Sequence, residues 1–303
     1  MMELTAFQQK IAEILPQINL RFNEPMAKHT SFRIGGPASV MAFPKDNDQL
    51  REILKQSALL DCKMFILGAG TNVLAPDEGI DGLVIVLKDA LDGITQLDRT
   101  HIRVAAGVTM TRAAVFAANA GLSGLEFAHG IPGTVGGGVY MNAGAYGGEI
   151  CQVCQSVEIM DRDGNITQLT NEDMQFSYRH SRLEDEGGIV LSAVFSLSEK
   201  PESEIRALMQ DLMMRRKASQ PLDLPSAGSA FKRPAQGYAA ALIDQAGLKG
   251  FRIGDAAISL KHAGFAVNLG SASAKDMKAL LEAVAKKVYE DSGIVLEPEV
   301  RIL

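Results

Sequence analysis

The sequence predicts a fold that mixes helices and strands throughout the chain, and three observations support that prediction. Before residue 94, apolar runs and a helical pattern follow the order strand, helix, strand, loop, strand, which is an α/β signature. Residues 156–169 alternate in hydropathy around Asp163-Gly164, which is typical of a β-hairpin. The last third contains two long helical patterns, each with an apolar stripe.

The first region is expected to cover residues 1–93 and to open with an amphipathic helix. A strand (ASVMAFP, 38–44) is followed by a helix (46–60) that Asp46 or Asn47 caps, and then by two strands (63–67 and 82–87). The loop GAGTNVL lies between these last two strands.

The second region is expected to cover residues 94–200, with a strand at 101–107 and a helix at 109–121 that ends at Gly121. The third covers 201–303. Its first helix carries an apolar stripe of Ile205, Leu208, Met209 and Leu212, which we expect to be core packing. Its second helix carries a Ser273/Asp276 cap signal and a stripe of Met277, Leu280, Leu281, Val284 and Val288. The last strand, 294–303, either stays with this region or returns to the first.

Composition narrows the classes of function. The net charge of -6 and the pI near 5.5 argue against a nucleic-acid-binding surface. The N-terminal residues lack the basic and apolar parts of a signal peptide, and no apolar run reaches the roughly 18 residues that span a bilayer. Cys62, Cys151 and Cys154 form no disulfide framework, and the lone CxxC favours unpaired thiols over a metal or redox centre. We expect a cytoplasmic protein with no membrane or nucleic-acid partner.

Two glycine-rich segments, LGAGTNVL (67–74) and GIPGTVGGGVYMNAG (130–144), are flanked by apolar residues and not by linker residues. Glycine lets a ligand approach the backbone closely, and successive amides form a concave anion site. Neither segment fits GxGxxG or GxxxxGK[ST], and a tight turn explains a single cluster equally well. Because there are two clusters, the sequence favours a dinucleotide held against the backbone.

Six motifs in order make the prediction more specific. They are HTSFRIGGPA (29–38), LGAGTNVL (67–74), GIPGTVGGGVYMNAGAYGGE (130–149), YRHSRL (178–183), PSAGSAFKRP (225–234) and LEPEVRIL (296–303). From about residue 25 to the end, the chain closely resembles the UDP-N-acetylenolpyruvoylglucosamine reductase family, flavoenzymes that make UDP-N-acetylmuramate for peptidoglycan. The resemblance implies an α+β chain with a two-subdomain FAD-binding fold of the vanillyl-alcohol-oxidase type (PCMH) and a C-terminal α+β substrate-binding domain.

The resemblance also implies non-covalent FAD, reduced by NADPH and reoxidised by UDP-N-acetylglucosamine enolpyruvate. FAD would lie against Gly68, Ala69, Gly70, Thr71, Asn72, Gly130, Ile131, Pro132, Gly133, Thr134, Gly136, Gly137, Asn142, Ala143 and Gly144, with its pyrophosphate on backbone amides. His129 is expected to be a polar neighbour of the cofactor or a core histidine. No histidine spacing indicates a metal, so we expect no catalytic metal.

Three residues match the catalytic positions of the family. Ser229 corresponds to the serine that protonates C2 of the substrate, and Arg179 to the arginine that stabilises the enolate. Glu299 corresponds to the glutamate that acts with that arginine. Glu297 lies nearby, and only the motif favours Glu299. A glutamate that donates a proton would need a raised pKa, and hence burial. Taken singly, Ser229 could be a turn residue and Arg179 a surface ion-pair partner.

Basic residues are needed for the UDP diphosphate, and we expect Lys232 and Arg233, with Tyr178 and Asn142 as supporting groups. Many family members have FKNP where this chain has FKRP, so Arg233 adds a charge near the expected phosphates. The chain lacks the inserted tyrosine loop, as does the shorter subtype of the family. We expect a monomer.

Two other functions remain open on the sequence. A flavin oxidase of the same fold, acting on a small 2-hydroxy acid, fits the glycine-rich segments but not PSAGSAFK or LEPEVR. A non-catalytic binder of a nucleotide explains the glycines but gives Ser229, Arg179 and Glu299 no purpose.

Overall fold

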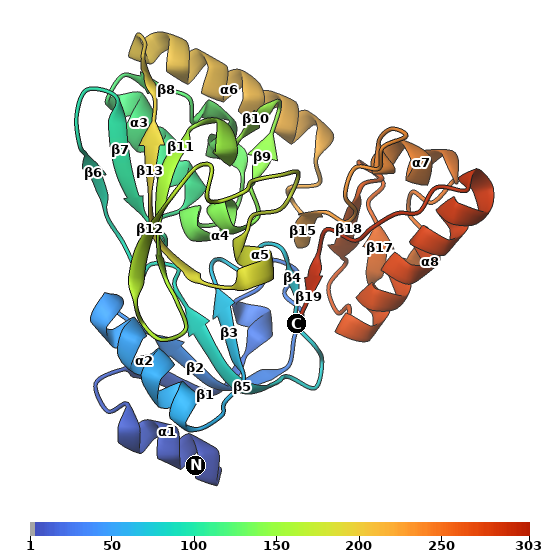
Figure 1. Cartoon of the computed structure of the whole chain (residues 1–303). Coiled ribbons are helices and arrows are strands. Elements are labelled where there is room, and N and C mark those ends of the chain that lie inside the picture. The colour runs from blue at the N-terminus through green and yellow to red at the C-terminus, as the bar shows by residue number, and fades with distance from the viewer. Residues whose placement is uncertain (1–3) are drawn as a thin grey trace. The chain divides into compact units, whose positions relative to one another are not determined.

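The structure is a computed structural model that describes residues 4–303, and the chain divides into two compact units, each built from several segments of the sequence. The first unit combines residues 1–22, 39–69 and 82–214. The second combines residues 23–38, 70–81 and 215–303. Figure 1 shows the elements of each, and helices and strands are mixed throughout, which confirms the predicted class.

Most of a four-stranded sheet belongs to the first unit. Its order is β1-β2-β5-β3, and β3 and β5 pair in parallel. Helix α1 precedes β1, and α2 precedes β3. Helix α2 begins where the sequence predicted, because the Asp46 side chain accepts a hydrogen bond from the Gln49 amide (2.8 Å). The elements are α1 (Ala6–Ile14), β1 (Asn19–Pro25), β2 (Pro37–Phe43), α2 (Asn47–Leu59), β3 (Met64–Leu67) and β5 (Ile80–Val86).

A five-stranded antiparallel sheet completes the first unit, in the order β12-β11-β13-β7-β6. The predicted hairpin around Asp163-Gly164 is confirmed, since β11 pairs with β12 from Met160↔Ile166 to Ser156↔Thr170. Helix α4 packs beside β13 and β7 of this sheet, and α3 packs beside α4. The elements are β6 (Ile94–Gln96), β7 (His101–Ala105), α3 (Met110–Asn119), α4 (Val135–Tyr140), β11 (Cys154–Met160), β12 (Ile166–Thr170) and β13 (Ile189–Ser196).

Shorter elements connect these strands. They are η1 (Met26–Lys28), β8 (Leu122–Ser123), η2 (Glu126–Gly130), β9 (Gly144–Ala145), β10 (Gly148–Glu149), η3 (Ile150–Gln152), α5 (Leu183–Glu186) and β14 (Ser198–Glu199). The long helix α6 (Glu202–Ser219) follows, and its expected stripe is only partly buried. Ile205 and Met209 are buried, whereas Leu208 is 45% exposed, so its place in the stripe was wrong.

The second unit is built on an antiparallel sheet in the order β15-β18-β17-β16. Helix α8 packs beside β16 and β17 and buries all five residues of its predicted stripe, below the capping box of Ser273 and Asp276. The last strand, β19, pairs in parallel with β4, and β4 directly follows GAGTN in the sequence. The elements are β4 (Val73–Leu74), β15 (Ser226–Ser229), α7 (Ala239–Gln245), β16 (Arg252–Ile253), β17 (Ala256–Ile258), β18 (Phe265–Asn268), α8 (Ala274–Ser292) and β19 (Arg301–Ile302).

Within the described residues, no helix is both long enough and apolar enough to cross a bilayer.

Candidate active site

The first unit brings the two glycine-rich segments into contact. A Cβ added to Gly68 would lie 2.5 Å from Oγ1 of Thr134, so the end of GAG packs on the GIPGT segment. Within residues 4–303, the amides of Gly68 and Ala69 donate no hydrogen bond, and both residues are only half-buried. These two amides are therefore available to a ligand.

The rest of GAGTN belongs to the second unit, where it supports the chain itself. Gly70 has φ +63°, and its carbonyl accepts a hydrogen bond from the Ser31 amide (2.9 Å). Nδ2 of Asn72 donates to the Glu299 carbonyl (3.1 Å), and the Asn72 carbonyl accepts from the Arg301 amide (3.1 Å). Asn72 thus holds the C-terminal strand in place beside Glu299.

The glycines of GTVGGG form a short helix, α4, that the sequence analysis did not predict. Its first amides are used by the chain: Val135 donates to the Val108 carbonyl (2.8 Å) and Gly136 to the Ala106 carbonyl (2.9 Å). A Cβ on Gly136 would lie 2.9 Å from the Cβ of Ala106, which is closer than such atoms normally approach. Gly136 therefore has a packing role inside the unit as well as the cofactor role expected of it.

Gly137 differs from its neighbours in α4. It is exposed, and the nearest atom to a Cβ placed there is Oγ1 of Thr134, at 3.6 Å. Thr134 caps the helix through the Gly137 amide (3.4 Å). Gly137 is thus a position of this segment at which a cofactor could approach the backbone without first displacing a side chain.

His129 is the last residue but one of η2 and immediately precedes GIPGT. Its Nδ1 atom is buried without a hydrogen-bond partner among the described residues, and burial lowers the pKa of the imidazole. A neutral ring with an unpaired nitrogen is suited to a polar ligand group. The unused amides of Gly68 and Ala69 belong to the same unit and are likewise available to a polar ligand group.

Arg179 lies on a tight turn that the Ser177–His180 bridge closes. Its φ is +56°, an uncommon conformation for a residue with a side chain, and its Nη2 donates to the Gly144 carbonyl (2.9 Å). Its guanidinium carbon is 5.1 Å from the ring centroid of Tyr178, which is 45% exposed. Asn142 is 1% exposed and donates from Nδ2 to the Ser177 carbonyl (2.9 Å), which places it behind this turn.

Ser229 and Glu299 are brought together in the second unit. Ser229 is exposed at the end of β15, opposite Phe265 of β18, after Gly228 at φ +78°. The Glu299 amide donates to the carbonyl of Ala230, the residue after Ser229 (2.9 Å). Two motifs almost 70 residues apart in the sequence, AGSAF and LEPEVR, therefore lie side by side, and an isolated bridge joins Phe231 to Pro298.

The surroundings of the two C-terminal carboxylates differ. Glu297 is exposed and its Oε1 is 2.5 Å from Nζ of Lys232. Glu299 is half-buried between Pro298 and buried Val300. Glu297 is thus engaged with Lys232, whereas the backbone of Glu299 is bonded to the residue that follows Ser229. The same ion pair means that Lys232, which we expected at the diphosphate, already has an anionic partner.

Arg233 stacks on Tyr238, with its guanidinium carbon 4.1 Å from the ring centroid. Tyr238 is 61% exposed. The ring attracts the cation and holds the guanidinium in place. A guanidinium is planar and permanently charged, which suits it to a phosphate.

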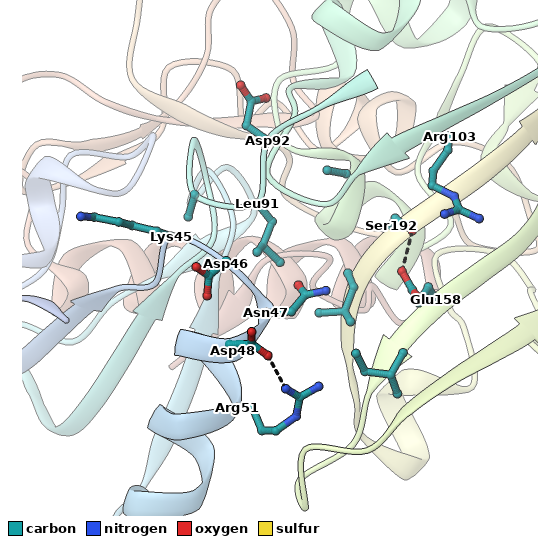
Figure 2. Close-up of a pocket in the computed structure, with 14 residues that line it drawn as sticks. Lys45, Asp46, Asn47, Asp48, Arg51, Leu91, Asp92, Arg103, Glu158 and Ser192 are labelled. Atoms are coloured by element: carbon teal, nitrogen blue, oxygen red, sulfur yellow. Dashed lines mark hydrogen bonds and ion pairs between the residues drawn. The ribbon is translucent and has the colours of Figure 1, made fainter. Parts of the chain in front are cut away.

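Figure 2 shows a surface cavity of about 560 Å³ in the first unit, near the start of α2. It contains none of the expected site residues. Its charges are largely paired: Arg51 with Asp48 (2.6 Å) and Asp92 with Arg112 (2.7 Å), while Glu158 accepts a hydrogen bond from Ser192 (3.1 Å). None of the three cysteines is in a disulfide, and the described residues include no cluster of three metal-ligating side chains.

Two family models match most of the chain. The family model for an FAD binding domain matches residues 38–170, and the model for the C-terminal domain of UDP-N-acetylenolpyruvoylglucosamine reductase matches residues 220–303. Together they confirm the expected class, an FAD-binding fold followed by a C-terminal domain.

Proteins named UDP-N-acetylenolpyruvoylglucosamine reductase are similar over almost their full length. The one from Agathobacter rectalis is 45% identical over 98% of both chains, and that from Caldanaerobacter subterraneus subsp. tengcongensis is 46% identical over 97% of both. The crystal structure of the Thermus caldophilus reductase has a TM-score of 0.79 and 36% identity, covering 94% of this chain and 98% of that one. The chain therefore belongs to the UDP-N-acetylenolpyruvoylglucosamine reductase family.

Proposed function

We propose that the chain reduces UDP-N-acetylglucosamine enolpyruvate to UDP-N-acetylmuramate, a step of peptidoglycan precursor synthesis, as an FAD-dependent oxidoreductase with NADPH as reductant. The observation that carries the proposal is that the Glu299 amide bonds to the carbonyl of Ala230, directly after Ser229, in the domain that matches the reductase C-terminal model. The same match counts against an oxidase of small 2-hydroxy acids, whose fold would explain only the glycine-rich segments.

FAD would be held non-covalently by the GAGTN and GIPGT segments, with polar contacts from the Gly68 and Ala69 amides and from His129. When bound, FAD takes a hydride from NADPH and supplies it to C3 of the enolpyruvyl group. The remaining work belongs to the side chains of this chain, because hydride addition leaves negative charge at C2 and on the carboxylate.

Ser229 is the proposed proton donor to C2. Its exposed position after a glycine turn leaves the hydroxyl accessible to substrate. A hydroxyl is a weak acid, so it can serve only when it is placed directly at a strongly basic carbon. Arg179 is proposed to stabilise the enolate through its permanent charge, and Glu299 to polarise the carboxyl group or to relay a proton.

Lys232, Arg233 and Tyr178 are proposed to bind the UDP portion. Arg233 has the strongest support of the three, because Tyr238 holds its guanidinium. Lys232 would have to exchange Glu297 for a phosphate, which a surface ion pair permits at little cost. We also propose that the protein acts as a monomer in the cytoplasm, where both NADPH and nucleotide sugars are found, without nucleic-acid or membrane partners.

An anaerobic visible spectrum tests the reaction. The purified protein should be yellow, should bleach when NADPH is added, and should regain its colour with UDP-N-acetylglucosamine enolpyruvate. Ser229→Ala should still bleach with NADPH but should regain colour on the order of 10²- to 10⁴-fold more slowly, since it lacks the proton donor. A flavin that bleaches but is reoxidised only by oxygen would reject the substrate, and normal reoxidation of the alanine variant would reject the role of Ser229.

A further inference from the structure

We propose that Asn142 and Glu149 are positioning residues for Arg179. They anchor the β9–β10 hairpin, whose Gly144 carbonyl accepts a hydrogen bond from the guanidinium, and the turn that carries the Arg179 backbone. The inference rests on the proposed function, in which Arg179 faces the reacting carboxylate. Neither residue needs to touch the substrate for this role. The contacts all lie within the first unit.

The first step concerns the backbone of the turn. Arg179 adopts a left-handed conformation, φ +56°, which is unfavourable for a residue with a long side chain. Such a conformation persists only when the surrounding structure enforces it. The Ser177–His180 bridge closes the turn by two backbone hydrogen bonds of 3.1 and 3.2 Å. The Ser177 carbonyl accepts a further bond from Nδ2 of Asn142 (2.9 Å), so the turn is fixed from behind.

The second step concerns the amide of Asn142, whose orientation is set by its neighbours. Nδ2 donates to the Ser177 carbonyl and to Oε2 of Glu149 (3.1 Å), two groups that can only accept. Oδ1 accepts from the Cys151 amide (3.0 Å), a group that can only donate. The side chain is 1% exposed, and the reversed amide would lose all three bonds. Asn142 is therefore a rigid link between the hairpin and the turn.

The third step concerns the other end of the arginine. Nη2 of Arg179 donates to the Gly144 carbonyl (2.9 Å), and Gly144 pairs with Glu149 across β9 and β10. Oε2 of Glu149 also accepts a hydrogen bond from Sγ of Cys151 (3.7 Å), so its carboxylate is held at two points. Asn142, Gly144 and Glu149 belong to one short segment. That segment holds the Arg179 turn at Ser177 and the guanidinium at Gly144.

A cradle for the cofactor alone would not require this arrangement. The side-chain amide of Asn142 is used by contacts within the chain, and a Cβ added to Gly144 would lie 2.6 Å from Cγ of Glu149. What the network does fix is the direction from which the Arg179 guanidinium leaves the turn. Misplacing a charged group by about 1 Å costs on the order of 100-fold in rate, so the network should influence only the step that uses this charge.

The test is Asn142→Asp, which keeps the shape of the side chain but replaces its donors by oxygens facing two acceptors. We expect flavin reoxidation by UDP-N-acetylglucosamine enolpyruvate to slow on the order of 10- to 100-fold in rapid mixing. Reduction by NADPH and the Kd for FAD should change by much smaller factors than reoxidation. Glu149→Ala should show the same split, and Glu149→Gln, which retains an accepting oxygen, should lose less than Glu149→Ala.

Asn171→Asp is the matched control. Nδ2 of Asn171 donates to the carbonyls of Cys151 (2.8 Å) and Cys154 (2.7 Å), so this variant disturbs the same segment without reaching Arg179. It should lower the melting temperature but leave the ratio of the two half-reactions near that of the parent. The proposal is overturned if Asn142→Asp slows both half-reactions equally, loses FAD, or reoxidises normally. Should it fail to fold, equal losses in Glu149→Ala and Glu149→Gln overturn it. A parent protein that the enolpyruvyl substrate cannot reoxidise would instead reject the proposed function.

Discussion

At the scale of single residues, the environment of each carboxylate separates two glutamates that the sequence leaves almost equivalent. Glu297 and Glu299 lie on the same strand-like segment, and only a motif favoured the second. The structure distinguishes the two glutamates. Glu297 is exposed and paired with Lys232, whereas Glu299 is half-buried and directly follows the bridge between Phe231 and Pro298. These surroundings favour Glu299 over Glu297 for the proposed catalytic role.

Glu299→Gln and Glu297→Gln form a matched pair that tests this distinction. Glu299→Gln should slow reoxidation of the flavin by substrate on the order of 10²-fold, because it removes a charge or proton at the reacting group. Glu297→Gln removes only an exposed ion pair, worth about 0.2–1 kcal/mol, so its effect should stay within about fivefold. Stopped-flow absorbance of the flavin measures both. Equal losses in the two variants would contradict the assignment.

At the scale of elements, long periodic patterns were predictable and α4 was not. The stripe of α8 and the Asp163-Gly164 hairpin follow from local patterns, and both are confirmed. Helix α4 contains three glycines in six residues, each of which disfavours a helix by about 1 kcal/mol. It forms because Thr134 caps it and because Val135 and Gly136 bond to the carbonyls of Val108 and Ala106, contacts that no local pattern reveals.

The glycines of α4 should respond in opposite ways to alanine. Gly136→Ala places a methyl group 2.9 Å from Ala106 and should destabilise the protein by about 1–3 kcal/mol. Gly137→Ala is exposed and helical, so it should stabilise the protein without FAD by about 0.5–1 kcal/mol. If the cofactor lies against Gly137, the same variant should also raise the Kd for FAD. Denaturant titration and flavin fluorescence measure the two effects, and unchanged FAD affinity would remove Gly137 from the cofactor site.

At the scale of the whole molecule, the sequence analysis expected regions that are each continuous along the chain. The compact units instead each combine three separate segments of the sequence. The predicted boundaries at residues 93 and 200 follow composition along the chain. The parallel pairing of β19 with β4 and the Asn72–Glu299 hydrogen bond join segments more than 200 residues apart. Such pairings depend on tertiary contacts, which a single sequence does not show. The resemblance to a family supplied the candidate residues, and the structure supplied the neighbours that hold them.

Each unit has its own hydrophobic core, and the two clusters share no residue. Leu83 of β5 is fully buried in the first core, and Leu280 of α8 is fully buried in the second. Leu83→Ala and Leu280→Ala should each cost about 2–5 kcal/mol through the cavity that they leave. Native-state hydrogen exchange should show faster opening mainly in the unit that carries the substitution, because local stability follows local packing. Leu59→Ala, 74% exposed at the end of α2, is the control and should change stability by less than about 0.5 kcal/mol. If both core variants accelerate exchange in both units to the same extent, the two cores unfold as one cooperative structure, and the division into units has no energetic meaning.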